Sequence, residues 1–118
     1  MDIIFIRELR VETTIGVYPH ERESRCILLV DLELATDIQP AAATDRLDQT
    51  VDYQAVAQRI SALAAVSDHQ LVETLAERIA QQLLREFAIP WLRLSLRKPG
   101  VPSNALEAGV IIERGCQG

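Results

Sequence analysis

A lysine stands at the end of a row of leucines in the segment 91–98. Leu92, Leu94 and Leu96 would share one face of a β-strand, and Lys98 is the next residue on that face. Partial removal from water favours the neutral amine, which would suit Lys98 to acid–base catalysis near neutral pH. The alternative is a lysine whose stem covers the strand end while its ammonium group reaches solvent.

A carboxylate interrupts the apolar side of the segment 71–87, which has helical periodicity. On a helical wheel Glu73 falls between Ala80 and Leu84, inside the apolar sector. A carboxylate there needs a partner, and the paired N–H donors on the edge of a guanidine-like heterocycle would suit it. A glutamate at the sector boundary that reaches water or an arginine is the other interpretation.

Tyr53 and Glu21 are weaker candidates when each residue is taken alone. Tyr53 opens a helix, where a tyrosine at the edge of the core is common. Glu21 lies in a connecting loop, where an acid is usually solvated. Residue type and position therefore do not assign chemistry to either side chain.

Metal chemistry is not indicated by the sequence. His20 and His69 are the only histidines, and His20 has no second histidine at the spacing of a zinc-binding helix. The chain also lacks a glycine-rich phosphate loop, a Ser-His-Asp order and paired CxxC motifs. We expect neither a metal nor a cofactor.

The elements that must position these residues follow from the spacing of apolar side chains. Four stretches have strand character and two have the 3.6-residue period of a helix. The strands are expected at 3–17, 26–37, 91–98 and 107–114, and the helices at about 53–64 and 71–87, with a loop at 38–52. The order ββααββ predicts an α+β domain in which both helices cover one face of a four-stranded antiparallel sheet. Asp52 is the expected N-cap of the first helix.

Length and charge narrow the class of protein. A chain of 118 residues fits one domain, 1–118, and its net charge of −5 without a basic cluster indicates neither a nucleic-acid partner nor a membrane partner. Cys26 and Cys116 do not form a disulfide framework and are expected to be reduced thiols of a cytoplasmic protein. The segment 3–6 is apolar on both faces, which predicts that another subunit covers one of them.

Several short segments occur in a specific order along nearly the whole chain. They are Met1-Asp2-Ile3, Thr14-Ile15-Gly16-Val17-Tyr18 with Glu21 after it, Val51-Asp52-Tyr53, the run 71–77, Lys98-Pro99-Gly100 and the run 109–115. In this order and spacing they resemble the dihydroneopterin aldolase family. The sequence departs from the usual family pattern at Pro19, His20, Cys26 and His69, none of which is an expected site residue.

The resemblance implies a fold, a reaction and a set of site residues. The fold would be the tunnelling fold, in which protomers build a barrel, usually an octamer of two rings with the sites between subunits. Glu73 would hold the amino-pyrimidinone edge of a pterin, with Val72 and Asp52 as further substrate-binding residues. Lys98 would move protons around the pterin N5, while Tyr53 acts near the side-chain hydroxyls and Glu21 helps to set the polar site.

The implied reaction is a metal-free retro-aldol cleavage in folate biosynthesis. 7,8-Dihydroneopterin would give 6-hydroxymethyl-7,8-dihydropterin and glycolaldehyde, and the side chain could also be epimerised at C2′. One alternative is a dihydroneopterin triphosphate epimerase of the same fold, which would need extra basic residues, with Arg97, Arg22 and Arg25 as candidates. Another is a non-catalytic ring-forming binding module, which would not explain why Lys98 and Glu73 lie in apolar rows.

Overall fold

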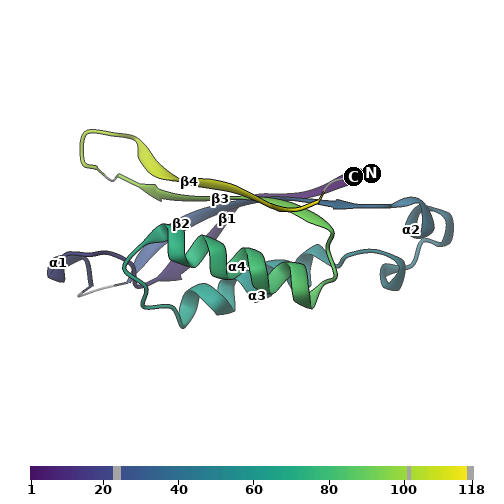
Figure 1. Ribbon diagram of the computed structural model, residues 1–118, viewed down its shortest axis with the longest axis horizontal. Helices are drawn as coiled ribbons and strands as arrows, with labels where there is room; N and C mark the ends of the chain where they lie inside the picture. The colour runs from purple at the N-terminus through teal and green to yellow at the C-terminus, as the bar shows by residue number, and fades with distance from the viewer. Residues whose placement is uncertain (23–24, 101, 117–118) are drawn as a thin grey trace.

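Four strands form one antiparallel sheet whose spatial order is the order of the chain (Figure 1). The structure is a computed structural model and describes residues 1–22, 25–100 and 102–116. The strands are β1 (Asp2–Thr13), β2 (Cys26–Thr36), β3 (Trp91–Pro99) and β4 (Glu107–Gly115). β1 and β4 are the two edges, so among the described residues each has one side with no strand partner.

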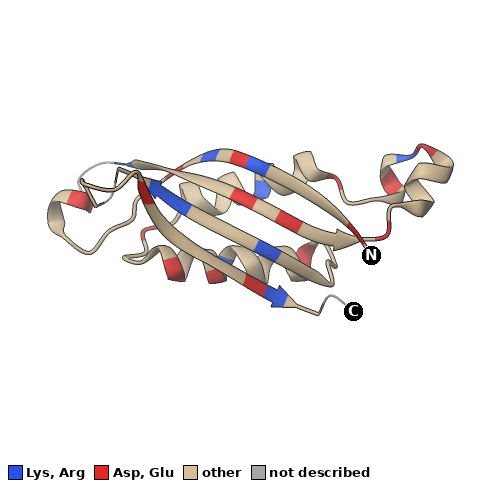
Figure 2. Ribbon diagram, turned by 90° about the horizontal axis from the view of Figure 1, so that it is seen from above, with Lys and Arg blue, Asp and Glu red and all other residues tan. Residues whose placement is uncertain are grey.

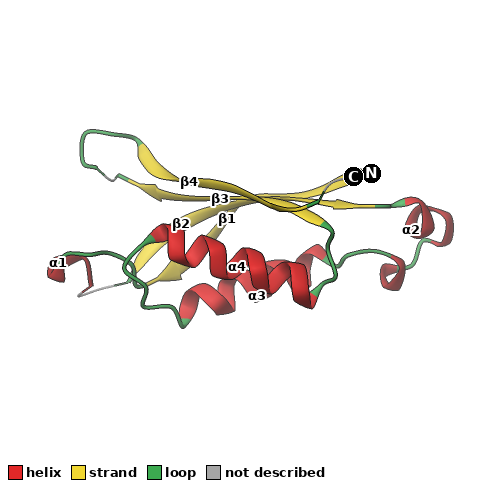
Figure 3. Ribbon diagram, viewed as in Figure 1, coloured by secondary structure: helices red, strands yellow, loops and turns green. Residues whose placement is uncertain are grey.

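Two long helices cover one face of the sheet (Figure 3). They are α3 (Tyr53–Ala65), which packs on β1, and α4 (Val72–Glu86), which packs on β3 and β4. Asp52 caps α3 as predicted, because its Oδ1 accepts the backbone N–H groups of Gln54 and Ala55 at 3.0 and 3.2 Å. The predicted α+β class and the ββααββ order of the main elements are confirmed.

Three short helices were not predicted. They are α1 (Pro19–Arg22), α2 (Gln39–Thr44) and the 3₁₀ turn η1 (Leu47–Gln49). The prediction of a loop at 38–52 is therefore wrong for most of its length. Pro40 in the first turn and the alanines that follow it favour a helix, which ends where Asp45 adopts the left-handed conformation at φ 55°.

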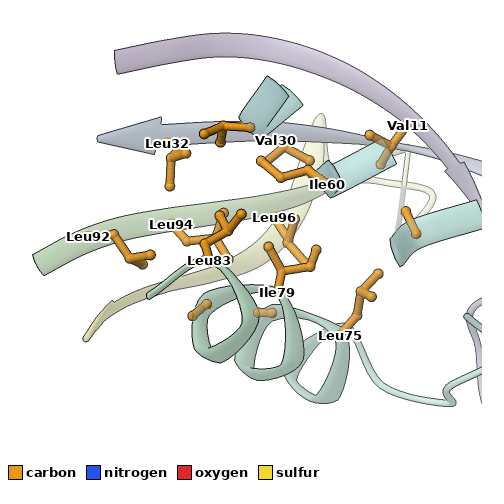
Figure 4. Close-up of a cluster of buried hydrophobic side chains, with 14 of the residues drawn as sticks. Val11, Val30, Leu32, Ile60, Leu75, Ile79, Leu83, Leu92, Leu94 and Leu96 are labelled. Carbon is orange, nitrogen blue, oxygen red and sulfur yellow. The ribbon is translucent and has the colours of Figure 1, made fainter. Parts of the chain in front are cut away.

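The core lies between the helices and the sheet (Figure 4). Leu92, Leu94 and Leu96 of β3 are fully buried, as the leucine row predicts. They pack in the same cluster as Ile79 and Leu83 of α4. This packing fixes the direction of β3, and it therefore fixes the place where Lys98 leaves the core.

A bulge divides β1 into two halves. Ile6 pairs with Leu32 and Leu9 pairs with Val30, so β1 has one more residue than β2 in this interval. Glu8 takes up the extra length at φ 54°, and its backbone N–H donates to Asp31 Oδ1 at 2.8 Å.

The bulge keeps one face of β1 on the core. Ile4 and Ile6 pack on the core before it, and Leu9 and Val11 do so after it. The prediction that this strand continues to residue 17 is wrong, because β1 ends at Thr13. Ile15 is nevertheless buried beyond the strand end, while Val17 is exposed.

The other face of the sheet carries charges instead of helices (Figure 2). Arg97 lies 3.0 Å from Asp31 and 3.1 Å from Glu107, which ties the three strands β2, β3 and β4 together. Phe5 and Ile111 are apolar and more than half exposed in this protomer. Among the described residues, no helix combines the length and the apolar character that a bilayer-crossing segment needs.

Candidate functional site

Lys98 reaches out of the leucine row towards a carboxylate from another part of the chain. Its side chain is only 15% exposed, and its Nζ lies 3.2 Å from Glu21 Oε2. The sequence left two interpretations of Lys98 open. The structure places the amine in a polar, sheltered pair and not in open solvent.

Glu21 is held by the backbone of its own turn. Its Oε1 accepts the N–H groups of Val17 at 3.2 Å and Tyr18 at 3.1 Å, while its Oε2 faces Lys98. The Tyr18 N–H, followed by the Lys98 ammonium group, holds the pKa of the Glu21 carboxyl below its usual value of 4.5. Glu21 is therefore not a freely solvated loop glutamate.

A hollow of about 310 Å³ opens beside Lys98. Its lining comes from the first turn of α4 and from the facing parts of β3 and β4. The lining residues are Val72, Glu73, Lys98, Ala108, Gly109 and Val110. A cation, a carboxylate and apolar walls thus share one cavity, which is the usual composition of a small-molecule site.

Glu73 differs from its prediction in one respect. The helical wheel placed it among apolar side chains, but it is exposed in the protomer. The reason is that the start of α4 lies over the small residues Ala108 and Gly109, which leave the hollow open. The carboxylate therefore faces a space that a ligand can enter.

Gly109 was missed by reasoning from the sequence. A side chain there would run into the backbone carbonyl of Leu96 on the neighbouring strand, so only glycine allows this close approach. A glycine inside an otherwise apolar strand was the available signal. Gly109 is one of the residues that line the hollow beside Lys98.

Tyr53 and Asp52 do not join this group. They lie at the start of α3, beside the end of α4, whereas Val72 and Glu73 lie at the opposite end of α4 (Figure 1). Tyr53 is 62% exposed, and Asp52 lines a separate hollow of about 490 Å³ that also contacts Phe87. The structure therefore brings together four of the expected site residues within one protomer and leaves two at the far end.

The uncovered face of the sheet has a larger hollow of about 570 Å³. Its charged lining residues neutralise one another, as Arg97 does with Asp31 and Arg93 does with Glu33 at 3.6 Å. The hollow at Lys98 differs from it, because the exposed Glu73 and the sheltered Lys98 both line the cavity. The hollow beside Lys98 is therefore the candidate site.

Comparison with known proteins finds close relatives of this chain in sequence and in structure. The family model described as dihydroneopterin aldolase matches residues 4–113. The dihydroneopterin aldolase of Escherichia coli strain K12 is 42% identical over 115 residues, covering 98% of this chain and 94% of the relative. The enzyme of Streptomyces coelicolor is 41% identical over 102 residues and covers 86% of each chain.

A solved structure extends the match to three dimensions. The crystal structure of E. coli dihydroneopterin aldolase in complex with neopterin has a TM-score of 0.95 and 42% identity to this chain. The match covers 98% of this chain and 100% of that one. The sheet and both long helices therefore have the same arrangement in the two proteins.

Proposed function

The chain belongs to the dihydroneopterin aldolase family of folate-biosynthesis lyases, and from this premise we propose that the hollow beside Lys98 is where it cleaves 7,8-dihydroneopterin. The observation that carries the proposal is a cavity lined by both Lys98 and Glu73, with Glu21 paired to Lys98 beside it. The products are 6-hydroxymethyl-7,8-dihydropterin and glycolaldehyde. Neopterin, the ligand of the E. coli relative, has the same ring system as this substrate.

Glu73 provides the specificity for the ring. A pterin presents an amino group and a ring N–H side by side, and a carboxylate can accept both hydrogen bonds at once. Such a pair is stronger between apolar walls than in water. Val72 and Val110 provide these walls beside Glu73.

Lys98 provides the proton transfers. The bond between C1′ and C2′ breaks, the C2′ hydroxyl passes its proton to a water in the site to become the carbonyl of glycolaldehyde, and the bonding electron pair forms C1′=C6 while the C6=N5 pair moves onto N5. N5 takes up a proton as this happens. The water then returns its proton to C1′, which becomes the CH2OH group of the product, and loss of the proton at N5 restores the C=N bond. An ammonium group beside N5 donates the proton, and the neutral amine accepts it back.

Glu21 acts by placing this ammonium group. Its carboxylate is fixed by two backbone N–H groups, so the position of Lys98 is fixed in turn. Holding the proton donor in place before the substrate arrives lowers the entropic part of the barrier. Because its pKa is lowered, Glu21 remains ionised at neutral pH and is a poor proton carrier.

A neighbouring subunit completes the site. Tyr53 is too far along α3 to reach the Lys98 hollow of its own protomer, yet it is exposed at the other end of the molecule. Two unpaired strand edges and the exposed apolar Phe5 and Ile111 support a ring in which one protomer follows another. We propose an octamer in which Tyr53 of one protomer acts on the substrate side chain at the next.

The reaction needs neither a metal nor a cofactor, because the dihydropterin ring accepts the electrons itself. The described cysteines, Cys26 and Cys116, are free thiols, which agrees with a cytoplasmic location for the enzyme. Rejoining the cleaved bond with the opposite face of the aldehyde would give epimerisation at C2′ as a side reaction.

The alternative triphosphate substrate has less support. Of the basic residues that could bind it, Arg97 lies among carboxylates on the other face of the sheet. Arg25 donates to the backbone carbonyls of Glu12 and Ala65 at 3.2 and 2.8 Å. The side chain of Arg22 lies outside the described part of the chain.

The direct test is to incubate the purified protein with 7,8-dihydroneopterin and to measure glycolaldehyde. A parallel reaction with dihydroneopterin triphosphate separates the aldolase from the epimerase. Release of glycolaldehyde from the first substrate is the expected result. Turnover of the triphosphate alone, with no aldehyde released, would overturn the proposal.

A further inference from the structure

The turn between β1 and α1 packs its backbone against the Glu21 side chain. Gly16 lies in this turn at φ 138°, a conformation that residues with a side chain rarely adopt. We infer that Gly16 is a positioning residue for the reaction: its missing side chain lets the Glu21 carboxylate fold back onto the Val17 and Tyr18 N–H groups and thereby fixes the Lys98 ammonium group. This inference rests on the proposed function, because it assigns a task to the Glu21–Lys98 pair.

A side chain at position 16 has no room beside Glu21. A Cβ built at Gly16 would lie 2.5 Å from Glu21 Cβ and 3.0 Å from Glu21 Cδ. Real Cβ atoms do not approach other carbons so closely, so an alanine at this position must push Glu21 away. The displaced carboxylate would lose the N–H of Tyr18 at 3.1 Å or the ammonium group of Lys98 at 3.2 Å.

The turn around Gly16 is anchored on two sides. Ile15 is 1% exposed and fixes one side of Gly16 in the core. The backbone N–H of Gly16 donates to the carbonyl of Gln70 at 3.1 Å, in the loop that leads into α4. These contacts hold the turn in place, so an alanine at position 16 would strain the backbone at φ 138° and would also press on Glu21.

The same anchoring joins the two halves of the site. Gln70 lies shortly before Val72 and Glu73, and Glu21 faces Lys98. Gly16 therefore contacts both the segment that carries the ring-binding carboxylate and the carboxylate that holds the proton donor. An alanine here keeps the backbone bond to Gln70 but strikes Glu21, so it should disturb the chemical step more than the binding of the ring.

A double-mutant cycle tests the inference, with Gly16→Ala, Glu21→Gly and the two combined. Removing the Glu21 side chain also removes the atoms that a Cβ at position 16 would strike. We expect Gly16→Ala to lower kcat by about 10-fold or more, since small misplacements of catalytic groups have effects of this size. In the Glu21→Gly background the same change should alter kcat by less than about twofold.

Lys98 offers a readout that general loss of stability would not move. It is the only lysine of the chain, so protein labelled with ¹⁵N-lysine gives one side-chain ammonium signal. Gly16→Ala should shift this signal towards its position in Glu21→Gly. Gly115→Ala is the matched control, because Gly115 also has a positive φ of 90° and a crowded Cβ position, but at the far end of the sheet. It should lower stability and leave the signal in place.

The outcomes separate the inference from the function on which it rests. An equal loss of kcat from Gly16→Ala in both backgrounds would overturn the inference. If Gly16→Ala does not fold but the combined variant does, the clash with Glu21 is the cause and the inference stands. If neither folds, Gly16 acts through something other than Glu21. Full activity of Glu21→Gly would refute the proposed role of Glu21 itself.

Discussion

Lys98 Nζ lies 3.2 Å from Glu21 Oε2, although the two residues are 77 positions apart in the chain. The pair joins the end of β3 to the short helix α1, and its lysine lines the same hollow as Glu73. Because the other oxygen of Glu21 is bound by two backbone N–H groups, the carboxylate has a fixed position. Lys98 is thus the group that we propose exchanges a proton with a bound substrate.

Replacing Lys98 should abolish most of the chemistry and little of the binding. Lys98→Ala removes the proton donor at N5, so kcat should fall by about 10²–10⁴-fold. The affinity for a pterin product should change much less, because the ring edge contacts Glu73. Steady-state rates and a fluorescence titration with 6-hydroxymethyl-dihydropterin measure the two effects separately.

Two results would contradict this role for Lys98. If the variant had nearly normal kcat, Lys98 would have no catalytic role and would only cover the end of the strand. Covalent trapping of substrate on Lys98 by borohydride would keep its importance but replace acid–base catalysis with a Schiff base.

Replacing Glu73 should have the opposite profile. Glu73→Ala removes a contact made in both ground state and transition state, so binding should weaken by roughly 2–5 kcal/mol while kcat changes less. Isothermal titration with neopterin measures the loss. Glu77→Ala is the control, since Glu77 lies one turn along α4 and forms a bidentate pair with Arg114 at 2.9–3.1 Å outside the hollow. Equal losses in the two variants would show that the contact is not specific to Glu73.

Stability should depend on pH through Glu21. The pKa of this carboxyl is lowered in the folded protein, so its stabilising effect is present above the ordinary value of 4.5 and is lost as the pH falls through the lowered value. Glu21→Gln should therefore be less stable than the parent protein at neutral pH, and the difference should vanish in acid.

Unfolding by urea, followed by the fluorescence of the single tryptophan Trp91, measures this difference at a fixed protein concentration. A difference that stays constant from about pH 7 to about pH 3 would mean that the ion pair contributes nothing.

Mixed oligomers should recover activity that pure ones lack. We expect Tyr53→Phe and Lys98→Ala each to give slow enzymes. Co-expression of the two chains would form some interfaces that pair an intact Tyr53 end with an intact Lys98 end. Activity above the sum of the parents is the expected result. Light scattering should give a mass many times 13.2 kDa, and a monomer would exclude the shared site.

Chelators should leave turnover unchanged. The part of the chain that the structure describes brings no three His, Cys, Asp or Glu side chains into an arrangement that could bind a metal ion. Rates before and after dialysis against EDTA measure the effect. Loss of activity that zinc restores would assign a metal-binding role to His20 or His69.

The elements of the fold were predictable because their signals are local. The leucine row of β3 and the Asp52 cap each depend on residues within a few positions of one another. The end of β1 was not predictable, because Ile15 continues the apolar alternation after the strand has ended. The helix α2 was missed because proline and alanine together were interpreted as a loop.

The candidate site was predictable only in part, since its contacts are distant in sequence. Lys98 and Glu73 stood out as charges in apolar rows. The contact between Glu21 and Lys98, and the backbone clamp on Glu21, depend on how the turn folds onto the end of the sheet. The separation of Tyr53 from Lys98 likewise follows from the antiparallel course of α3 and α4, which no single motif encodes.

The bulge at Glu8 determines which side chains of β1 face the core, so adding or removing a single residue there would change which side chains are buried. Ile4 and Ile6 are even-numbered and Leu9 and Val11 are odd-numbered, yet all four pack on the core. A deletion of one residue at the bulge would turn one half of the strand over and exchange its apolar side chains with charged ones such as Arg10. Insertions and deletions in this strand should therefore persist in evolution only when they involve two residues, or when a second bulge restores the alternation of side chains between the two faces.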